Sequence, residues 1–160
     1  MANTVPAKDL HRIVLSCFIY NDEGKYLIIK RAPTHKAFPN KWAVPGGGLE
    51  QGDYINNKRD SVHSWFNVLE KVLRREVREE TGLEIESEQY FGNFVFIRPD
   101  NIAVLVIRFA ARKAAGDVVL EDGDSTEYAW VTAKEAATYD LIGNMAQEFR
   151  DVDSLLNPKP

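Results

Sequence analysis

Three glutamates near the middle of the chain, Glu76, Glu79 and Glu80, have the spacing at which side chains share one face of an α-helix. Carboxylates this close repel one another. They also lie just before Gly82, at the C-terminal end of the expected helix, where the helix dipole disfavours anions. Hard divalent ions such as Mg²⁺ take oxygen ligands of this kind and keep several waters. The spacing therefore predicts a divalent-metal site.

A second interpretation of the same residues is a solvated acidic helix face. Arg74, Arg75 and Arg78 would relieve the repulsion there, and Arg75 and Glu79 have the i, i+4 spacing of an ion pair. The surrounding sequence favours the metal site, because a PGGG loop precedes the helix and Gly82 closely follows the acids.

A long amphipathic helix is expected to carry these acids. From Ser61 to Glu80 the chain has no proline or glycine, and apolar residues recur at spacings of three and four: Val62, Trp65, Phe66, Leu69, Val72, Leu73 and Val77. Ser61 is a candidate N-cap, and Gly82 is a suitable C-cap. The pattern predicts one helix over 61–80 that ends at Gly82.

Strand and turn patterns surround this helix. Apolar runs at 11–20 and 25–31 flank a turn and predict a hairpin, and a second hairpin is predicted from the runs at 90–97 and 102–111. The segment KWAVPGGG predicts a short strand and then a loop whose glycines either turn sharply or approach another group closely. The last predicted elements are a strand at 127–132 and helices at 133–138 and 144–156. The order predicts an α/β fold with a mixed sheet.

Composition limits the classes of protein that need to be considered. A chain of 160 residues with 44% hydrophobic and 28% charged content predicts one domain over 1–160, with its core at about 11–157 and short flexible ends. No apolar stretch approaches the roughly 20 residues that cross a bilayer, so no membrane association is expected. The net charge of −4 disfavours non-specific binding to nucleic acid.

The N-terminus lacks the pattern of a secretory signal or a transit peptide, which predicts a cytoplasmic location. Cys17, the single cysteine, lies in an apolar run and is expected to be a small buried hydrophobe.

The residues REVREETGL, from Arg75 to Leu83, resemble the second half of the box of the Nudix hydrolase family at every position. That half reads Arg-Glu-hydrophobic-any-Glu-Glu-any-Gly-hydrophobic. LIIKR before the glycine loop, KWAVPGG leading into it and EYAWVTAKEA near the C-terminus also look like family features in family order. The resemblance covers roughly residues 11 to 140.

The first half of the box departs from the family pattern. After Gly47 and five further residues the chain has Asp53 where the family has glutamate, and 21 residues rather than seven separate Asp53 from Arg75. The box is thus 14 residues longer than the pattern, and a polar loop is expected at 54–61. The distance between Asp53 and the helix is left open.

The resemblance implies an α/β/α sandwich in which the box helix packs beside a mixed sheet. It also implies a Mg²⁺-dependent pyrophosphohydrolase, with Mn²⁺ as the alternative ion. The substrate would be a small nucleotide: a nucleoside triphosphate, ADP-ribose, a sugar nucleotide or a dinucleoside polyphosphate. Glu76, Glu79 and Glu80 would hold the metal, a carbonyl of Gly46 would be a further ligand, and Arg75 would orient the carboxylates.

The resemblance leaves the catalytic base open, because family members use either a box glutamate, here Glu79 or Glu80, or an acid from a distant loop. Glu127, at the start of EYAWV, resembles such a distal acid.

Substrate contacts are expected from the positively charged entrance to the glycine loop. Arg31 resembles the family's strand-end arginine, and Lys41 adds a second positive charge near the loop. The backbone of Gly47 and Gly48 would contact a phosphate oxygen.

Two other functional classes are compatible with the sequence. A Nudix-fold sensor would bind a nucleotide without hydrolysing it, and the altered first half of the box would be its mark. An acidic interaction domain would have no nucleotide site. The intact set of Arg75, Glu76, Glu79 and Glu80 favours the enzyme. The resemblance also makes a homodimer an expectation, since many relatives dimerise.

Overall fold

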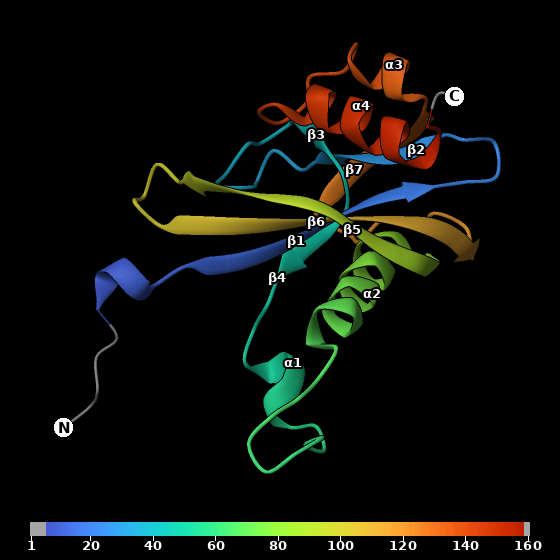
Figure 1. The fold of residues 1–160 in the computed structure, drawn as a ribbon. Helices are drawn as coiled ribbons and strands as arrows, with labels where there is room; N and C mark the ends of the chain where they lie inside the picture. The colour runs from blue at the N-terminus through green and yellow to red at the C-terminus, as the bar shows by residue number, and fades with distance from the viewer. Residues whose placement is uncertain (1–5, 159–160) are drawn as a thin grey trace.

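The fold is built on one mixed β-sheet (Figure 1). In residues 6–158, the part of the chain that this computed structural model describes, seven strands form a sheet in the order β3, β2, β1, β6, β5, with β4 beside β1 and β7 beside β2. Strands β1 and β6 run parallel, and the other pairs run antiparallel. The strands are β1 (Arg12–Tyr20), β2 (Tyr26–Arg31), β3 (Trp42–Ala43), β4 (Gly46–Gly48), β5 (Glu84–Ile97), β6 (Ala103–Ala115) and β7 (Ser125–Val131).

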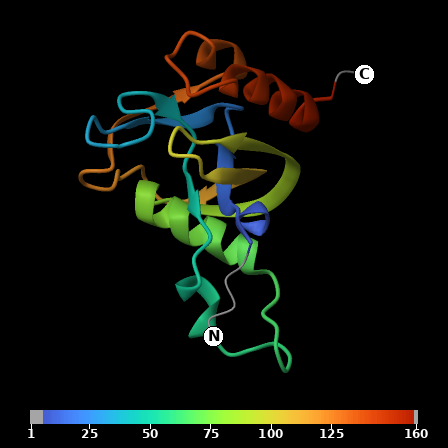
Figure 2. The ribbon, with the colours of Figure 1, turned by 90° about the vertical axis from the view of Figure 1, so that its left-hand side faces the viewer.

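Helices cover both faces of this sheet, as Figures 1 and 2 show from two directions. Helix α2 (Val68–Thr81) packs on one face, and α4 (Met145–Leu156) packs on the other beside the short helix α3 (Ala133–Ala136). Residues of β1 alternate between the two cores, with Cys17 facing α2 and Phe18 facing α4. The α/β/α sandwich and the mixed sheet predicted from the sequence are confirmed.

Both predicted hairpins form, as do the strand near residue 127 and the last two helices. Of the predicted flexible ends, residues 1–5 and 159–160 lie outside the described residues, whereas Ala7–Asp9 form a 3₁₀ helix, η1. Within the described part of the chain, every helix is too short or too polar to cross a membrane.

Helix α2 begins at Val68, so the prediction of a helix over 61–80 was wrong at its N-terminal end, and Ser61 is not its N-cap. Asn67 stands at the N-cap in the left-handed region, with φ of 54°, which interrupts the helical backbone. Before it, Trp65 stacks on Tyr54 and donates its indole N–H to the carbonyl of Asn57. The apolar spacing at 62–66 therefore belongs to a loop with its own contacts.

The C-terminal end of α2 follows the prediction. Gly82 adopts φ of 70° and its N–H bonds the carbonyl of Arg78, which is the arrangement of a glycine C-cap. The carboxylates of the last turn are fixed relative to the sheet by this ending and by the buried contacts of Val72, Leu73 and Val77.

The short helix α1 (Gly52–Ile55) leads into a loop, and the end of this helix and the loop extend from the body as an arm, as Figures 1 and 2 both show. We call residues 54–67 the arm. It leaves the body after Asp53 and returns at the start of α2.

Candidate active site

The three glycines expected to follow a short strand are themselves a strand, β4, paired with β1. None of them has a positive φ, so they are not needed for a sharp turn. They allow a close approach instead, because a Cβ added at Gly47 would overlap the carboxylate of Glu76 on α2. The glycine strand thus lets the acidic helix lie directly against the sheet.

Glu80 is hydrogen-bonded to this strand. Its Oε2 accepts a hydrogen bond of 2.9 Å from the backbone N–H of Gly46. Burial raises the pKa of Glu80 to about 8, and the Gly46 hydrogen bond opposes that shift. The nearby charges of Asp124 and Glu76 raise the pKa further. Burial also raises the pKa of Glu76, against the attraction of Arg75.

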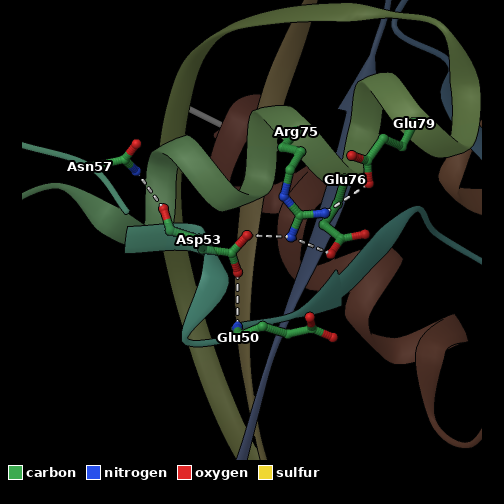
Figure 3. Close-up of polar contacts among 6 residues, drawn as sticks. All are labelled: Glu50, Asp53, Asn57, Arg75, Glu76 and Glu79. Atoms are coloured by element: carbon green, nitrogen blue, oxygen red, sulfur yellow. Dashed lines mark hydrogen bonds and ion pairs between the residues drawn. The ribbon is translucent and has the colours of Figure 1, made fainter. Parts of the chain in front are cut away.

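Arg75 joins the two separated halves of the box (Figure 3). Its Nη2 lies 2.8 Å from Oδ1 of Asp53 and 2.9 Å from Oε1 of Glu76, and its Nη1 lies 2.7 Å from Oε2 of Glu79. One guanidinium therefore holds three carboxylates in fixed relative positions, which is the orienting position expected for Arg75.

Asp53 reaches this network from α1. Its side chain is only 9% exposed, and its Oδ2 accepts a hydrogen bond of 2.8 Å from the backbone N–H of Glu50. The amide of Asn57 donates to its backbone carbonyl (Figure 3). The extra residues of the box thus leave the body only after Asp53 has contacted Arg75, which settles the distance that the sequence left open.

An acid that the sequence did not single out, Asp124, lies in the loop that covers the C-terminal end of α2. The loop of residues 116–124 lies over the C-terminal end of α2, where Val119 and Glu121 donate backbone hydrogen bonds to the carbonyls of Thr81 and Glu80. Asp124, the last residue of this loop, is close enough for its charge to act on Glu80. The sequence signal was present, since Asp124 ends an Asp/Gly-rich loop directly before β7.

Glu127 lies elsewhere. On β7, its Oε1 lies 2.7 Å from Nζ of Lys30, its register partner on β2. The pair lies two residues along the strands from Ile28 and Ala129, whose side chains belong to the α4 face of the sheet, so it lies on the same face. It therefore lies on the face opposite to α2, and the structure does not bring it together with the three carboxylates. The strand alternation of β7 decides this, because a shift of one residue changes the face.

The two expected substrate-binding cations also separate. Lys41 forms an ion pair of 2.5 Å with Asp140, near the start of the segment that leads to α4. Arg31 lies on the α2 side: its charge acts on Glu80, and its Nε donates to the carbonyl of Ala37. Among the residues that the structure describes, Nη1 of Arg31 has no hydrogen-bond partner. Arg31 thus keeps one guanidinium nitrogen without a hydrogen bond to a described residue, whereas Lys41 is paired with Asp140.

A cavity of about 140 Å³ is lined by Val14, Val104 and Val106, whose strand alternation places them on the sheet face opposite to α2. Ala37, whose carbonyl Arg31 contacts, lines it together with Phe38 and Phe96. Arg12 also lines it and lies over Gly48, where an added Cβ would come within 2.7 Å of its Nη2. Aromatic rings beside a guanidinium suit a flat heterocycle attached to an anion.

The donor chemistry of the box fits a hard divalent cation. Within residues 6–158 no three acidic, histidine or cysteine side chains converge as a complete metal cage. Mg²⁺ does not need one, because it is usually held by one or two carboxylates, with waters and substrate phosphates as its other ligands. Glu76, Glu79 and Glu80 project such oxygens from adjacent turns of one helix.

Comparisons with known proteins agree with this arrangement of an acidic helix against a glycine strand in an α/β/α sandwich. A sequence model of the NUDIX domain family matches residues 10–57 and 64–152. The chain belongs to the Nudix family, and it is a Nudix hydrolase. The matched ranges leave out residues 58–63, which lie in the arm.

Curated relatives include proteins named nucleoside triphosphatase NudI from Salmonella agona and Salmonella typhimurium, each 30% identical over 135 residues that cover 78% of this chain and 85% of the relative. Among solved structures, a MutT protein from Methanosarcina mazei has a TM-score of 0.68 at 24% identity, covering 93% of this chain and 96% of its own. The NUDIX domain of Shewanella oneidensis NrtR, complexed with ADP ribose, has a TM-score of 0.73 at 15% identity, covering 98% and 96%. These two structures show a shared fold.

Proposed function

We propose that this hydrolase is a Mg²⁺-dependent pyrophosphohydrolase that acts on nucleoside triphosphates. The observation that carries the proposal is the network around Arg75, in which one arginine holds Asp53, Glu76 and Glu79 beside the glycine strand. An acidic interaction domain has no need for this convergence. The choice of nucleoside triphosphates over ADP-ribose, sugar nucleotides and dinucleoside polyphosphates follows the name of the relatives that are 30% identical.

Each part of the site has a role in this proposal. Glu76, Glu79 and Glu80 would hold Mg²⁺, or Mn²⁺ in its place. The bound ion would neutralise phosphate charge and lower the pKa of a water. Arg75 keeps the carboxylates in position, as an outer partner of metal ligands does.

The substrate would reach the acidic helix from the cavity by passing round the loop of residues 32–41, because the cavity and α2 lie on opposite faces of the sheet. Its base would enter the cavity between Phe38 and Phe96, and its polyphosphate would pass Nη1 of Arg31. Gly47 and Gly48 remain candidates for backbone contacts to a phosphate oxygen. Asp124, in the loop that covers the C-terminal end of α2, replaces Glu127 as the proposed distal acid, because its charge acts on Glu80.

The test is turnover of a nucleotide panel with Mg²⁺ and with chelator. The panel contains nucleoside triphosphates, ADP-ribose, sugar nucleotides and dinucleoside polyphosphates, and the products are separated chromatographically. We expect nucleoside triphosphates to be hydrolysed only with the metal. Glu80→Gln should lower kcat by at least about tenfold. Loss of an outer partner of a metal ligand already costs about tenfold to a hundredfold, and Glu80 is a proposed ligand.

Glu70→Gln is the matched control, because Glu70 is an exposed glutamate in the first turn of the same helix. It should retain wild-type turnover. Nucleotide binding without metal-dependent turnover in the wild type would contradict the proposal and indicate the sensor. Preference for ADP-ribose would contradict only the substrate class.

Turnover of the cavity variants tests where the base binds. Phe96→Ala should raise KM about fivefold to a hundredfold with little change in kcat, because base stacking on an aromatic ring contributes about 1–3 kcal/mol. Phe66→Ala, which removes an exposed phenylalanine of the arm, is the control. Equal KM values for the two variants would place the base elsewhere.

A further inference from the structure

His35 connects the phosphate-facing arginine to the loop acid. Its Nδ1 lies 2.8 Å from Nη2 of Arg31. Its Nε2 lies 2.8 Å from the carbonyl oxygen and 2.9 Å from the carboxylate Oδ1 of Asp124. The imidazole thus spans two segments that are 93 positions apart in the chain, at residues 31 and 124.

These contacts determine the state of the ring. A guanidinium does not give up its protons in proteins and can only donate. Nδ1 of His35 must therefore accept from Arg31, and the ring proton lies on Nε2, where it is donated to Asp124. The three residues form a directed chain of hydrogen bonds from Arg31 through a neutral imidazole to Asp124.

The chain constrains both of its ends. Arg31 is held through Nε by Ala37 and through Nη2 by His35, so its orientation is fixed while Nη1 points to no other described group. Asp124 is held at its carboxylate and its carbonyl, and this carbonyl also accepts the backbone N–H of Ala32. The side chains of His35 and Asp124 are 22% and 30% exposed, so water competes weakly for these hydrogen bonds.

We propose that His35 is a positioning residue of the hydrolase: it holds Arg31 toward the polyphosphate and holds Asp124 in the loop whose Glu121 N–H bonds the Glu80 carbonyl. The inference rests on the proposed function, which places the phosphates at Arg31 and the reacting water near the carboxylates. It adds a link between phosphate binding and the loop of residues 116–124, because movement of the imidazole would break the hydrogen bonds to Arg31 and to Asp124 together.

Two variants of His35 and one control test the proposal. His35→Ala should lower kcat/KM about tenfold to a hundredfold, the range seen when partners of site residues are removed. His35→Gln should recover part of the loss, because its amide offers one donor and one acceptor. His63→Ala is the control, since His63 is an exposed histidine in the arm. Melting temperatures of all three variants show whether a loss reflects unfolding.

A double-mutant cycle separates positioning from packing. The kcat effect of His35→Ala should disappear in an Asp124→Asn background, because the carboxylate to be positioned is already gone. Full additivity of the two substitutions would overturn the proposal. So would wild-type turnover by His35→Ala.

The tautomer gives a readout that does not depend on turnover. Long-range ¹H–¹⁵N spectra of the histidine side chains should show the Nε2–H tautomer for His35, and the Nδ1–H tautomer would overturn the chain of hydrogen bonds. Wild-type protein that hydrolyses no nucleotide with Mg²⁺ would overturn the proposed function, and the positioning role with it. An active wild type with an equally active His35→Ala would overturn the positioning role alone.

Discussion

At the scale of single residues, Arg75 connects parts of the site that are remote in sequence. It contacts Asp53 from α1 and two glutamates of its own helix. A lysine could not replace it, because a single ammonium group lacks the planar fork that contacts several carboxylates at once. The shorter side chain of Asp53, compared with the glutamate of the family pattern, is accommodated because α1 lies close to α2.

The ion pair between Asp53 and Arg75 gives a residue-scale prediction. Asp53→Asn should lower kcat about tenfold, the lower end of the range for outer partners of metal ligands, because Arg75 is then held only by the glutamates that it should position. Steady-state kinetics with Mg²⁺ measures this. Asp100→Asn, which removes an exposed ion pair with Arg98, is the control and should be neutral. Equal activity of the two variants would contradict an orienting role for Asp53.

Cys17 gives a second prediction at this scale. Its side chain has no exposed area, and burial raises the pKa of its thiol above the usual value for cysteine. Because only the thiolate is nucleophilic, the native protein should not react with a thiol reagent at pH 8 to 9, where an exposed cysteine would be partly ionised. One thiol should react after unfolding in denaturant. Rapid reaction of the native protein would show that this core opens readily.

At the scale of elements, strand β4 and helix α2 define the site together. The approach of Glu76 to Gly47 is possible only because the strand has no side chain at that position. Helix α2 in turn is positioned by apolar contacts on the side of the helix that faces the sheet, so its acids are held at the sheet surface by packing. The glycines and the glutamates are therefore one structural unit.

Gly47→Ala tests this unit. The added methyl group overlaps the Glu76 carboxylate, which is the end of a flexible side chain, so it should displace that carboxylate and reduce turnover with little loss of stability. Gly52→Ala is the matched control, because a Cβ there meets no atom within 4 Å and the residue has no positive φ. Chemical denaturation and kinetics of both variants measure the effect. Unchanged turnover in Gly47→Ala would mean that the Glu76 carboxylate lies farther from the strand.

At the scale of the whole molecule, the body and the arm are distinct. The body contains the sheet, both cores and all the proposed site residues, whereas the side chains of Trp65 and Arg59 bond and pack with other arm residues. The family match also leaves out residues 58–63. The arm exposes Ile55, Val62 and Phe66, and whether the protein is the expected homodimer stays a prediction.

Removal of residues 58–63 and closure with a short Gly/Ser linker tests the independence of the body. The melting temperature should change by no more than about 2–4 °C, the change that corresponds to about 1 kcal/mol in a domain of this size, and the metal-dependent activity should persist. Thermal unfolding and kinetics provide the measurement. Loss of cooperative unfolding would show that the arm is part of the folding unit.

The sequence by itself determined the features that local pattern encodes. The apolar periodicity from Leu69 onward and the cap at Gly82 predicted the part of α2 that carries the acids, and the alternating apolar runs predicted the strands. The same periodicity extended the helix wrongly to Ser61, because spacing does not distinguish side chains that pack on the sheet from Trp65, which packs on Tyr54.

Only the tertiary structure decided which remote residues meet the acidic helix. Asp53 joins it despite the longer box, Asp124 lies in the loop that covers its C-terminal end, and His35 bridges Arg31 to that loop. Glu127, three residues after Asp124, is excluded because strand β7 turns its side chain to the opposite face. The physical reason is that strand register and loop packing set these distances, and both depend on contacts between segments far apart in the chain.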